Sequence, residues 1–260
     1  MQSEYGKSWL AAPALFAAAA AALLAAWALV PPETLIPFFD CDGASPVETA
    51  TLPVFAAIVP FVWWKCPFGG SRRRRAVLCT MVSVVAVMAI VKETDLHNAV
   101  LNALYPDFTG EDGKLLPGLF KPDGRPLSGT PFKMRVLTNA AVPCGMKALI
   151  ALYFALFFGV FAAGLAYFAL PWIKGVFALE PAAWTFGCLG ASGVTVQIFD
   201  RLPAWWRGAD VAKDDLDMSF RAFCTCFEEG MELMIAVFAL LAIWQGRKAL
   251  EARGGAAAAG

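Results

Sequence analysis

Charge is scarce in this sequence. Only 16% of its 260 residues are charged, whereas a typical soluble domain carries about 25%. The formal net charge is +0, so no excess of basic residues favours a nucleic-acid partner. Hydrophobic residues make up 59% of the chain, and its mean hydropathy is +0.60. That is too much apolar surface for one water-soluble core, so we expect lipid to solvate much of the protein.

Histidine is almost absent, because His97 is the only one in the chain. A zinc hydrolase usually needs more nitrogen ligands, and one imidazole gives little basis for a nucleophilic triad. The sequence also lacks a nucleotide-binding loop, a haem histidine pair, a dinucleotide fingerprint and an intramembrane-protease motif. Its acidic residues match neither the Glu-x-x-His pattern of di-iron bundles nor the His-Glu-x-x-His of metalloproteases. The one cofactor left to consider is a divalent cation such as Mg²⁺, Mn²⁺, Fe²⁺ or Ca²⁺, bound mainly by carboxylates.

Long apolar runs are abundant instead. Lipid offers the backbone no hydrogen-bond partner, so runs that cross roughly 30 Å of hydrocarbon must be helices. The sequence therefore predicts an all-α, polytopic membrane helix bundle of about six transmembrane helices. We expect one integral membrane domain over residues 1–250 and a disordered, low-complexity tail over residues 251–260. The six predicted spans are Trp9–Val30, Val47–Trp64, Ala76–Val91, Met146–Trp172, Val176–Phe199 and Gly230–Trp244.

The first span has an alternative interpretation as a secretory signal. Lys7 precedes it, and "AWA" at residues 26–28 has the small-x-small pattern of a cleavage site. However, about 20 apolar residues is long for a signal core, and Pro13 interrupts the run. We therefore favour retention as the first membrane helix.

Basic residues predict the orientation. The segment "KCPFGGSRRRR" at residues 65–75 is the strongest basic run, and Lys174, Arg247, Lys248 and Arg253 fall on the same predicted side. Short loops rich in Lys and Arg face the cytoplasm, so both termini are expected inside. The acidic segments and the two long connections, at residues 98–144 and 200–232, then lie outside. Membrane insertion of this kind is typical of a bacterial inner (plasma) membrane protein.

Two acidic motifs are predicted at the outer face. In "VKETDLH", Glu93 and His97 are four residues apart and would share one face of a helix. In "CFEEGMEL", three carboxylates fall within one turn, at Glu228, Glu229 and Glu232. A helix N-terminus favours acidic groups, which suits the first two but not Glu232, because Glu232 begins an apolar stretch. An unpaired carboxylate at membrane depth costs a few kcal/mol and usually faces a partner or a cavity.

These motifs predict a polar pocket that opens outward. Glu93, His97, Glu228 and Glu232 are the candidate catalytic or ion-binding groups. Lys147 or Arg221 is the expected cation beside Glu232. Alternatively, these charged residues form no pocket and are only helix ends and surface ion pairs around the outer face. The candidate ligand-binding residues are Lys133, Arg135, Lys147, Glu48, Asp200 and Arg221.

The seven cysteines divide between the two sides. Cys41, Cys144, Cys224 and Cys226 fall outside, where an even set permits disulfides whose pairing the sequence does not fix. The remaining three fall in or near the cytoplasmic half. In the fifth span, Gly187, Gly190 and their neighbours give a small-residue spacing that favours close helix packing.

Two functions fit these observations. The first is an enzyme or binding protein for an anionic or lipid-headgroup ligand, with the acidic groups and His97 as acid–base groups or metal ligands. The second is a non-catalytic membrane subunit or carrier whose charges form structural pairs with other subunits or within the chain. In both, the lipid bilayer is a partner and nucleic acid is not.

Overall fold

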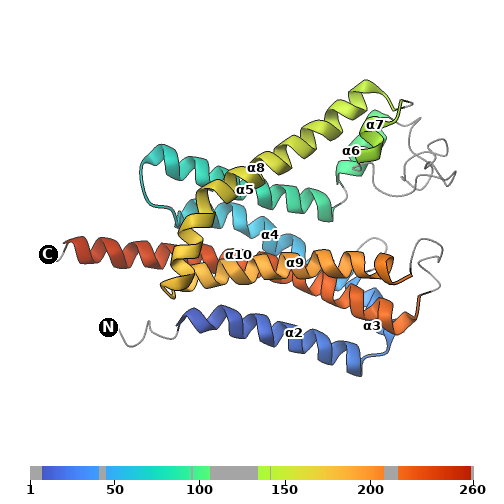
Figure 1. Ribbon diagram of the computed structural model, residues 1–260, viewed down its shortest axis with the longest axis horizontal. Helices are drawn as coiled ribbons and strands as arrows, with labels where there is room; N and C mark the ends of the chain where they lie inside the picture. Colours follow the sequence, from blue (N-terminus) through green and yellow to red (C-terminus); the bar gives the residue numbers. More distant parts are fainter. Residues whose placement is uncertain are drawn as a thin grey trace. The chain divides into compact units, whose positions relative to one another are not determined.

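The chain is helical throughout the part that the structure describes. The computed structural model describes residues 8–40, 45–94, 96–105, 134–140, 142–207 and 216–258, and these ranges contain no strand (Figure 1). This confirms the predicted all-α class. The elements are the 3-10 turn η1 (Ser8–Leu10) and the helices α2 (Ala11–Leu29), α3 (Pro32–Phe39), α4 (Pro46–Lys65), α5 (Arg72–Glu93), α6 (Leu96–Leu104), α7 (Met134–Thr138), α8 (Cys144–Phe177), α9 (Pro181–Arg207) and α10 (Met218–Ala258).

Five of these helices are long and apolar enough to cross a membrane. They lie at Ser8–Leu29, Pro46–Lys65, Arg72–Glu93, Cys144–Phe177 and Pro181–Pro203. The protein is therefore an integral, multi-pass membrane protein. The sixth predicted span lies within α10, which is not among the five. Its uncharged run between Glu232 and Arg247 is only about 14 residues, or roughly 21 Å of helix, shorter than a hydrocarbon core.

Two helices extend well beyond their predicted ends. α10 begins at Met218 rather than Gly230, because the Asp217 carboxylate accepts a hydrogen bond from the Phe220 backbone N–H at 2.9 Å and caps the helix. At its other end, α10 continues through Ala258, across most of the segment where the sequence predicts a tail. α9 ends at Arg207 rather than Phe199.

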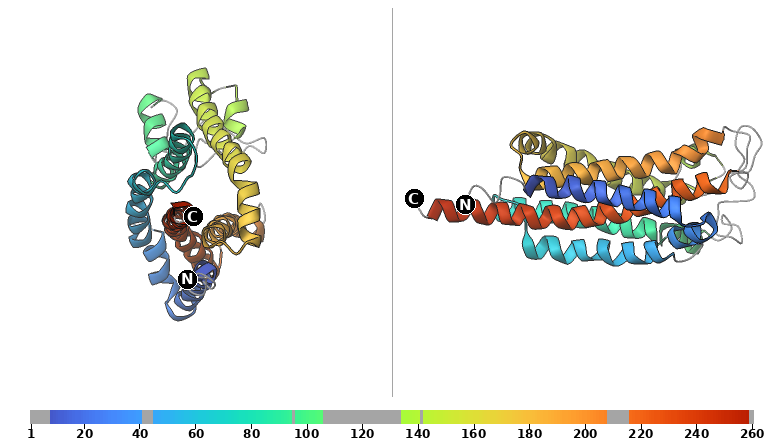
Figure 2. Two further views of the ribbon diagram at one scale, coloured as in Figure 1. Left: turned by 90° about the vertical axis from the view of Figure 1, so that its left-hand side faces the viewer. Right: turned by 90° about the horizontal axis from the view of Figure 1, so that it is seen from below.

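The chain divides into two compact units, residues 1–86 with 167–260 and residues 87–166. Helices α5 and α8 each contribute to both units. In the first unit, α10 packs against α2, α3, α4 and α9, and α2 also packs against α9 (Figures 1 and 2). α10 is thus the central helix of this unit, which explains why it needs less apolar surface than the helices around it.

Contacts at the two ends of α10 give the direction of its neighbours. Near its C-terminal part, Gly246 lies against Pro67, and Arg253 Nη2 lies 2.8 Å from Glu180 Oε1 at the start of α9. At its beginning, the Ser219 carbonyl accepts a hydrogen bond from Trp27 Nε1 at the end of α2, at 3.1 Å. α2 and α9 therefore run antiparallel to α10, and α4 runs parallel to it.

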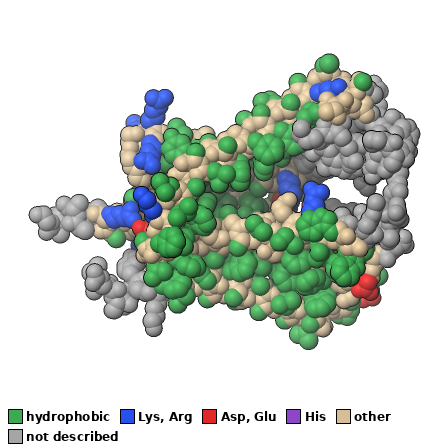
Figure 3. All heavy atoms as spheres, viewed as in Figure 1, with side chains coloured by type: hydrophobic (Ala, Val, Ile, Leu, Met, Phe, Trp, Pro, Cys, Tyr) green, Lys and Arg blue, Asp and Glu red, His purple; other side chains and the backbone are tan. Residues whose placement is uncertain are grey.

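The densest group of basic residues in the first unit lies at one of these two ends. We call the end with residues 65–75 and 247–253 the basic end. We call the end with residues 30–40, 45–48, 200–207 and 216–221 the opposite end. Lysine and arginine side chains gather around the C-terminal part of α10, while the surface over α2 and α9 is largely hydrophobic (Figure 3). This separation agrees with the predicted loop pattern. The assignment of the basic end to the cytoplasm stays a prediction.

The second unit has a small core of its own. Residues from α6, α7, α8 and the connection between α7 and α8 are buried together, and Tyr105, Leu137 and Phe154 pack against them. Residues 106–133 of the predicted long connection lie outside the described residues. The buried residues of this core are Leu101, Val136, Val142, Met146 and Ile150.

Candidate functional site on helix α10

The three glutamates of α10 lie inside the helix rather than at its start. Glu228 follows Met218 by about ten residues, or roughly 15 Å along the axis. The helix dipole favours acidic groups only within the first turn. The prediction that the dipole accounts for Glu228 and Glu229 is therefore wrong, and their position needs another cause.

The turn of α10 that carries the three glutamates packs beside apolar parts of α2 and α9. Gly230 lies against Leu23 of α2, and Phe227 and Met231 share a buried cluster with Val196 of α9. Leu23 is about six residues, or roughly 9 Å, from the end of α2. The acidic turn is thus below the end of a helix that is apolar over its whole length.

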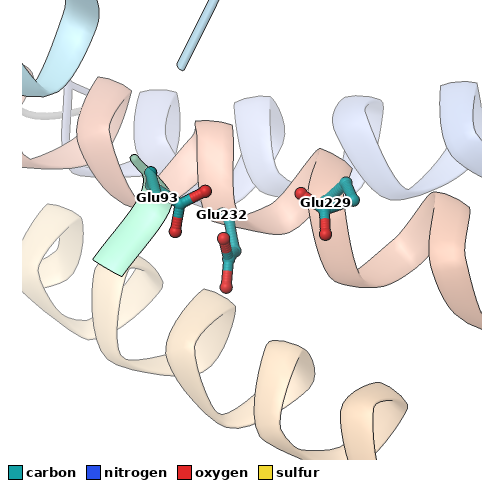
Figure 4. Close-up of side chains that lie close together, drawn as sticks. All are labelled: Glu93, Glu229 and Glu232. Atoms are coloured by element: carbon teal, nitrogen blue, oxygen red, sulfur yellow. The ribbon is translucent and has the colours of Figure 1, made fainter. Parts of the chain in front are cut away.

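Glu229 and Glu232 form a close acidic pair in the first unit. One carboxylate oxygen of each lies within 4.8 Å of the other. Figure 4 shows both side chains on successive turns of α10. Glu232 is buried, with 6% of its surface exposed, and Glu229 is half-buried. Two carboxylates this close repel one another unless a proton or a cation lies between them or a basic group compensates them.

The set of site residues expected from the sequence includes Glu228 and Glu232 but omits Glu229. The signal for Glu229 was its three-residue spacing from Glu232, which puts both side chains on one helix face. Glu228 is half-buried on the same turn. None of the three glutamates is without an interaction partner.

Glu93 and His97 do not share a helix. α5 ends at Glu93 and α6 begins at Leu96, so the predicted shared helix face is wrong. Glu93, also labelled in Figure 4, has a side chain only 8% exposed, and its carboxylate lies 3.1 Å from Lys92 Nζ. It belongs to the second unit. The side chain of His97 lies outside the described residues.

Two expected pocket residues have local partners instead. The Glu48 carboxylate accepts a hydrogen bond from the Ser45 backbone N–H at 2.9 Å, and Ser45 Oγ accepts one from the Glu48 N–H at 3.1 Å. This capping box begins α4. Asp200 is exposed within α9 and pairs with Arg201 at 3.2 Å. Helix start and surface pairing account for both.

The basic candidates fall into three groups. Lys133 lies outside the described residues, and Arg135 lies on α7 with its side chain outside them. Lys147 lies in the first turn of α8, half-buried, in the second unit. Arg221 shares α10 with Glu232, but about eleven residues separate them, or roughly 16 Å. Arg221 therefore does not reach Glu232 directly, and that alternative for the pair is wrong.

The outer cysteines that the structure describes are free thiols. Cys144 is exposed, whereas Cys224 and Cys226 are buried. Cys41 lies outside the described residues. Of the small residues in α9, Gly187 lies near Trp172, but a Cβ at Gly190 would have no described heavy atom within 4 Å. Close helix approach occurs at Gly230 instead.

No protein-family model, curated protein or solved structure matches this chain. The chemistry of the acidic turn is thus the basis for a functional proposal.

Proposed function

We propose that Glu229 and Glu232 bind a cation inside the membrane domain, and that the bound cation is the functional centre of the protein. The buried Glu232 carboxylate, within 4.8 Å of Glu229 and level with apolar helices, is the observation that carries this proposal. Ionisable groups at such depth are costly and typically mark an ion or substrate site. A carboxylate pair favours Mg²⁺, Mn²⁺ or Ca²⁺, which bind oxygen ligands.

Charged residues are absent from α9 and α10 between the acidic turn and the basic end. Between Glu232 and the basic end, α10 carries no charge before Arg247, and α9 carries none before Asp200. A through-path for ions normally needs polar groups along its length. A closed binding site therefore fits this pattern better than a channel.

The positive-inside rule gives the proposed orientation and location. With residues 65–75 in the cytoplasm, the acidic turn faces the extracytoplasmic side of a bacterial inner membrane. A cation there would attract an anionic ligand such as a phosphate-bearing lipid headgroup. Glu93 and His97 are the sequence-based candidates for further ligands or acid–base groups, and Lys133, Arg135 and Lys147 are the candidates to hold the anion.

The second candidate function is a non-catalytic membrane subunit whose charges are structural. The local roles of Glu48 and Asp200 favour it, because these residues have partners outside any pocket. The two functions differ in what the acidic pair does: a structural pair needs no bound cation.

We expect the purified protein in detergent to bind Mn²⁺ stoichiometrically, and Glu232→Gln to weaken binding by at least about 10-fold because one of two carboxylate ligands is lost. Glu229→Gln should weaken it similarly. Electron paramagnetic resonance of free Mn²⁺ during a titration measures this directly. Glu251→Gln is the matched control, because Glu251 lies on the same helix but is exposed at the basic end and paired with Arg247 at 2.9 Å.

Equal Mn²⁺ binding by wild type, Glu232→Gln and Glu251→Gln would show that the acidic pair is no cation site and would favour the structural function. If the acidic pair does bind Mn²⁺, competition by excess Mg²⁺ or Ca²⁺ shows which of these cations binds more tightly.

Orientation is tested separately by labelling single cysteines in an otherwise cysteine-free protein. We expect an impermeant maleimide to label Ser128→Cys in intact cells but to label Ser71→Cys only after lysis. The reverse pattern would turn the protein over in the membrane and place the acidic turn on the cytoplasmic side.

A further inference from the structure

Two cysteines meet at the basic end of the first unit, far along the chain from the acidic turn. The Sγ atoms of Cys66 and Cys79 lie 3.9 Å apart. Cys66 is the C-terminal cap of α4, and Cys79 lies two turns into α5, so the two thiols come from consecutive helices. A disulfide requires an Sγ–Sγ distance of about 2.05 Å, so the sulfurs need to approach by about 2 Å.

Local structure holds both thiols in place. The Val62 carbonyl accepts the Cys66 backbone N–H at 2.9 Å and lies 3.6 Å from the Cys79 Sγ. Cys66 has φ 37°, in the left-handed region that favours glycine. Helices often end in this conformation, but a cysteine there is unusual. The cap turns the Cys66 side chain toward α5.

The two thiols differ in access. Cys79 is only 1% exposed, whereas Cys66 is partly exposed at the helix end. A reagent from solution therefore reaches Cys66 first, and Cys79 is placed to react with whatever adduct Cys66 forms. An accessible cysteine beside a second, resolving cysteine is the arrangement of a redox-sensitive pair.

We propose that Cys66 and Cys79 are a reversible redox pair, oxidised by a low-molecular-weight disulfide. The Cys66 thiolate attacks one sulfur of the disulfide RSSR, whose S–S bond breaks. RS⁻ leaves and takes up the proton that Cys66 lost. The Cys79 thiolate then attacks the Cys66 sulfur, and the second RS⁻ leaves with the Cys79 proton. The protein dithiol loses two electrons, and RSSR becomes two RSH.

Oxidation would fasten the basic end of the unit. The loop that follows Cys66 already packs on α10, through Pro67 against Gly246 and Gly69 against Leu250. A Cys66–Cys79 bond would close this loop covalently and fix α4, α5 and α10 together. The orientation proposed above puts the pair in the cytoplasm, where thiols are normally kept reduced. The bond would therefore form under oxidising conditions and be removed afterwards.

The test is to treat the full-length protein in detergent with oxidised glutathione and map its thiols by mass spectrometry. We expect a linked pair of peptides containing Cys66 and Cys79, lighter by about two hydrogen masses than the reduced pair and separated by dithiothreitol. The oxidised protein should also unfold at a higher temperature, because the loop is closed. Cys188→Ser is the control, and it should leave the cross-link unchanged.

Cys66→Ser should abolish glutathione reactivity at Cys79, whereas Cys79→Ser should leave a stable glutathione adduct on Cys66. Because the cross-link is measured in the wild-type protein, the result does not depend on how well either variant folds. The proposal is overturned if oxidised glutathione leaves both wild-type thiols free to react with maleimide after denaturation. A glutathione adduct on Cys66 with Cys79 still free would overturn it as well.

Discussion

Gly230→Val is expected to destabilise the protein by about 3 kcal/mol, because it forces two packed helices apart. A Cβ at position 230 would lie 2.5 Å from Leu23 Cδ2 and 2.9 Å from Leu23 Cδ1. Both distances are far shorter than a carbon–carbon contact of about 3.5–4.0 Å. Leu23 also packs in the buried clusters on α10, so its whole side chain would have to move. Reversible unfolding by sodium dodecyl sulfate, followed by tryptophan fluorescence, measures the free energy.

Gly190→Val is the matched control. Gly190 lies in α9, and a Cβ there would have no described heavy atom within 4 Å. Valine is a slightly better helix former than glycine, so the free energy of unfolding should change by less than about 0.5 kcal/mol. Equal losses in both variants would mean that valine disturbs any helix of this protein and that the α2–α10 contact has no special weight.

Long apolar runs in the sequence predicted most of the membrane helices, because contact with lipid requires such runs. A helix facing hydrocarbon must be apolar along its exposed length. This holds for α2, and for α8 between Lys147 and Lys174 near its two ends. The same signal describes α10 poorly. α10 is covered by other helices, so it tolerates three glutamates and extends about 12 residues before its predicted start. α10 begins after Asp217, whose carboxylate caps the helix. Hydropathy does not detect such a cap, because Asp217 is one polar residue among other polar residues.

The candidate site was predicted only in part, for a related reason. Spacing within one helix was reliable where the helix continued, as it does from Glu229 to Glu232. It failed where the helix ended, as it does between Glu93 and His97. No glycine or proline lies between those two residues to signal the break. Glu48 was expected in the pocket as a charge at a helix end. However, Ser45 and Glu48 have the Ser-x-x-Glu spacing of a capping box, which is a sequence signal for a helix start.

The charge that compensates Glu232 is the remaining question at the acidic turn, and Lys147 is the sequence-based candidate. If the two residues form a buried pair, each single removal leaves an uncompensated charge. Glu232→Gln and Lys147→Met are then each expected to lower the free energy of unfolding by about 3–5 kcal/mol. The double variant should recover part of the loss, because neither charge remains. The free energy of unfolding is measured by sodium dodecyl sulfate titration in detergent for the wild type, the two single variants and the double variant. The coupling energy follows from these four values.

Arg221→Met is the control for this cycle, because about 16 Å of helix separates Arg221 from Glu232. Its effect should add to that of Glu232→Gln without coupling. The same measurement separates a lysine from a metal ion. If a bound cation alone compensates Glu232, a chelator destabilises the wild type as much as Glu232→Gln does, and the Lys147 cycle is additive. If Lys147 compensates it, the chelator has no effect and the cycle shows coupling. Additivity together with insensitivity to the chelator would rule out both partners.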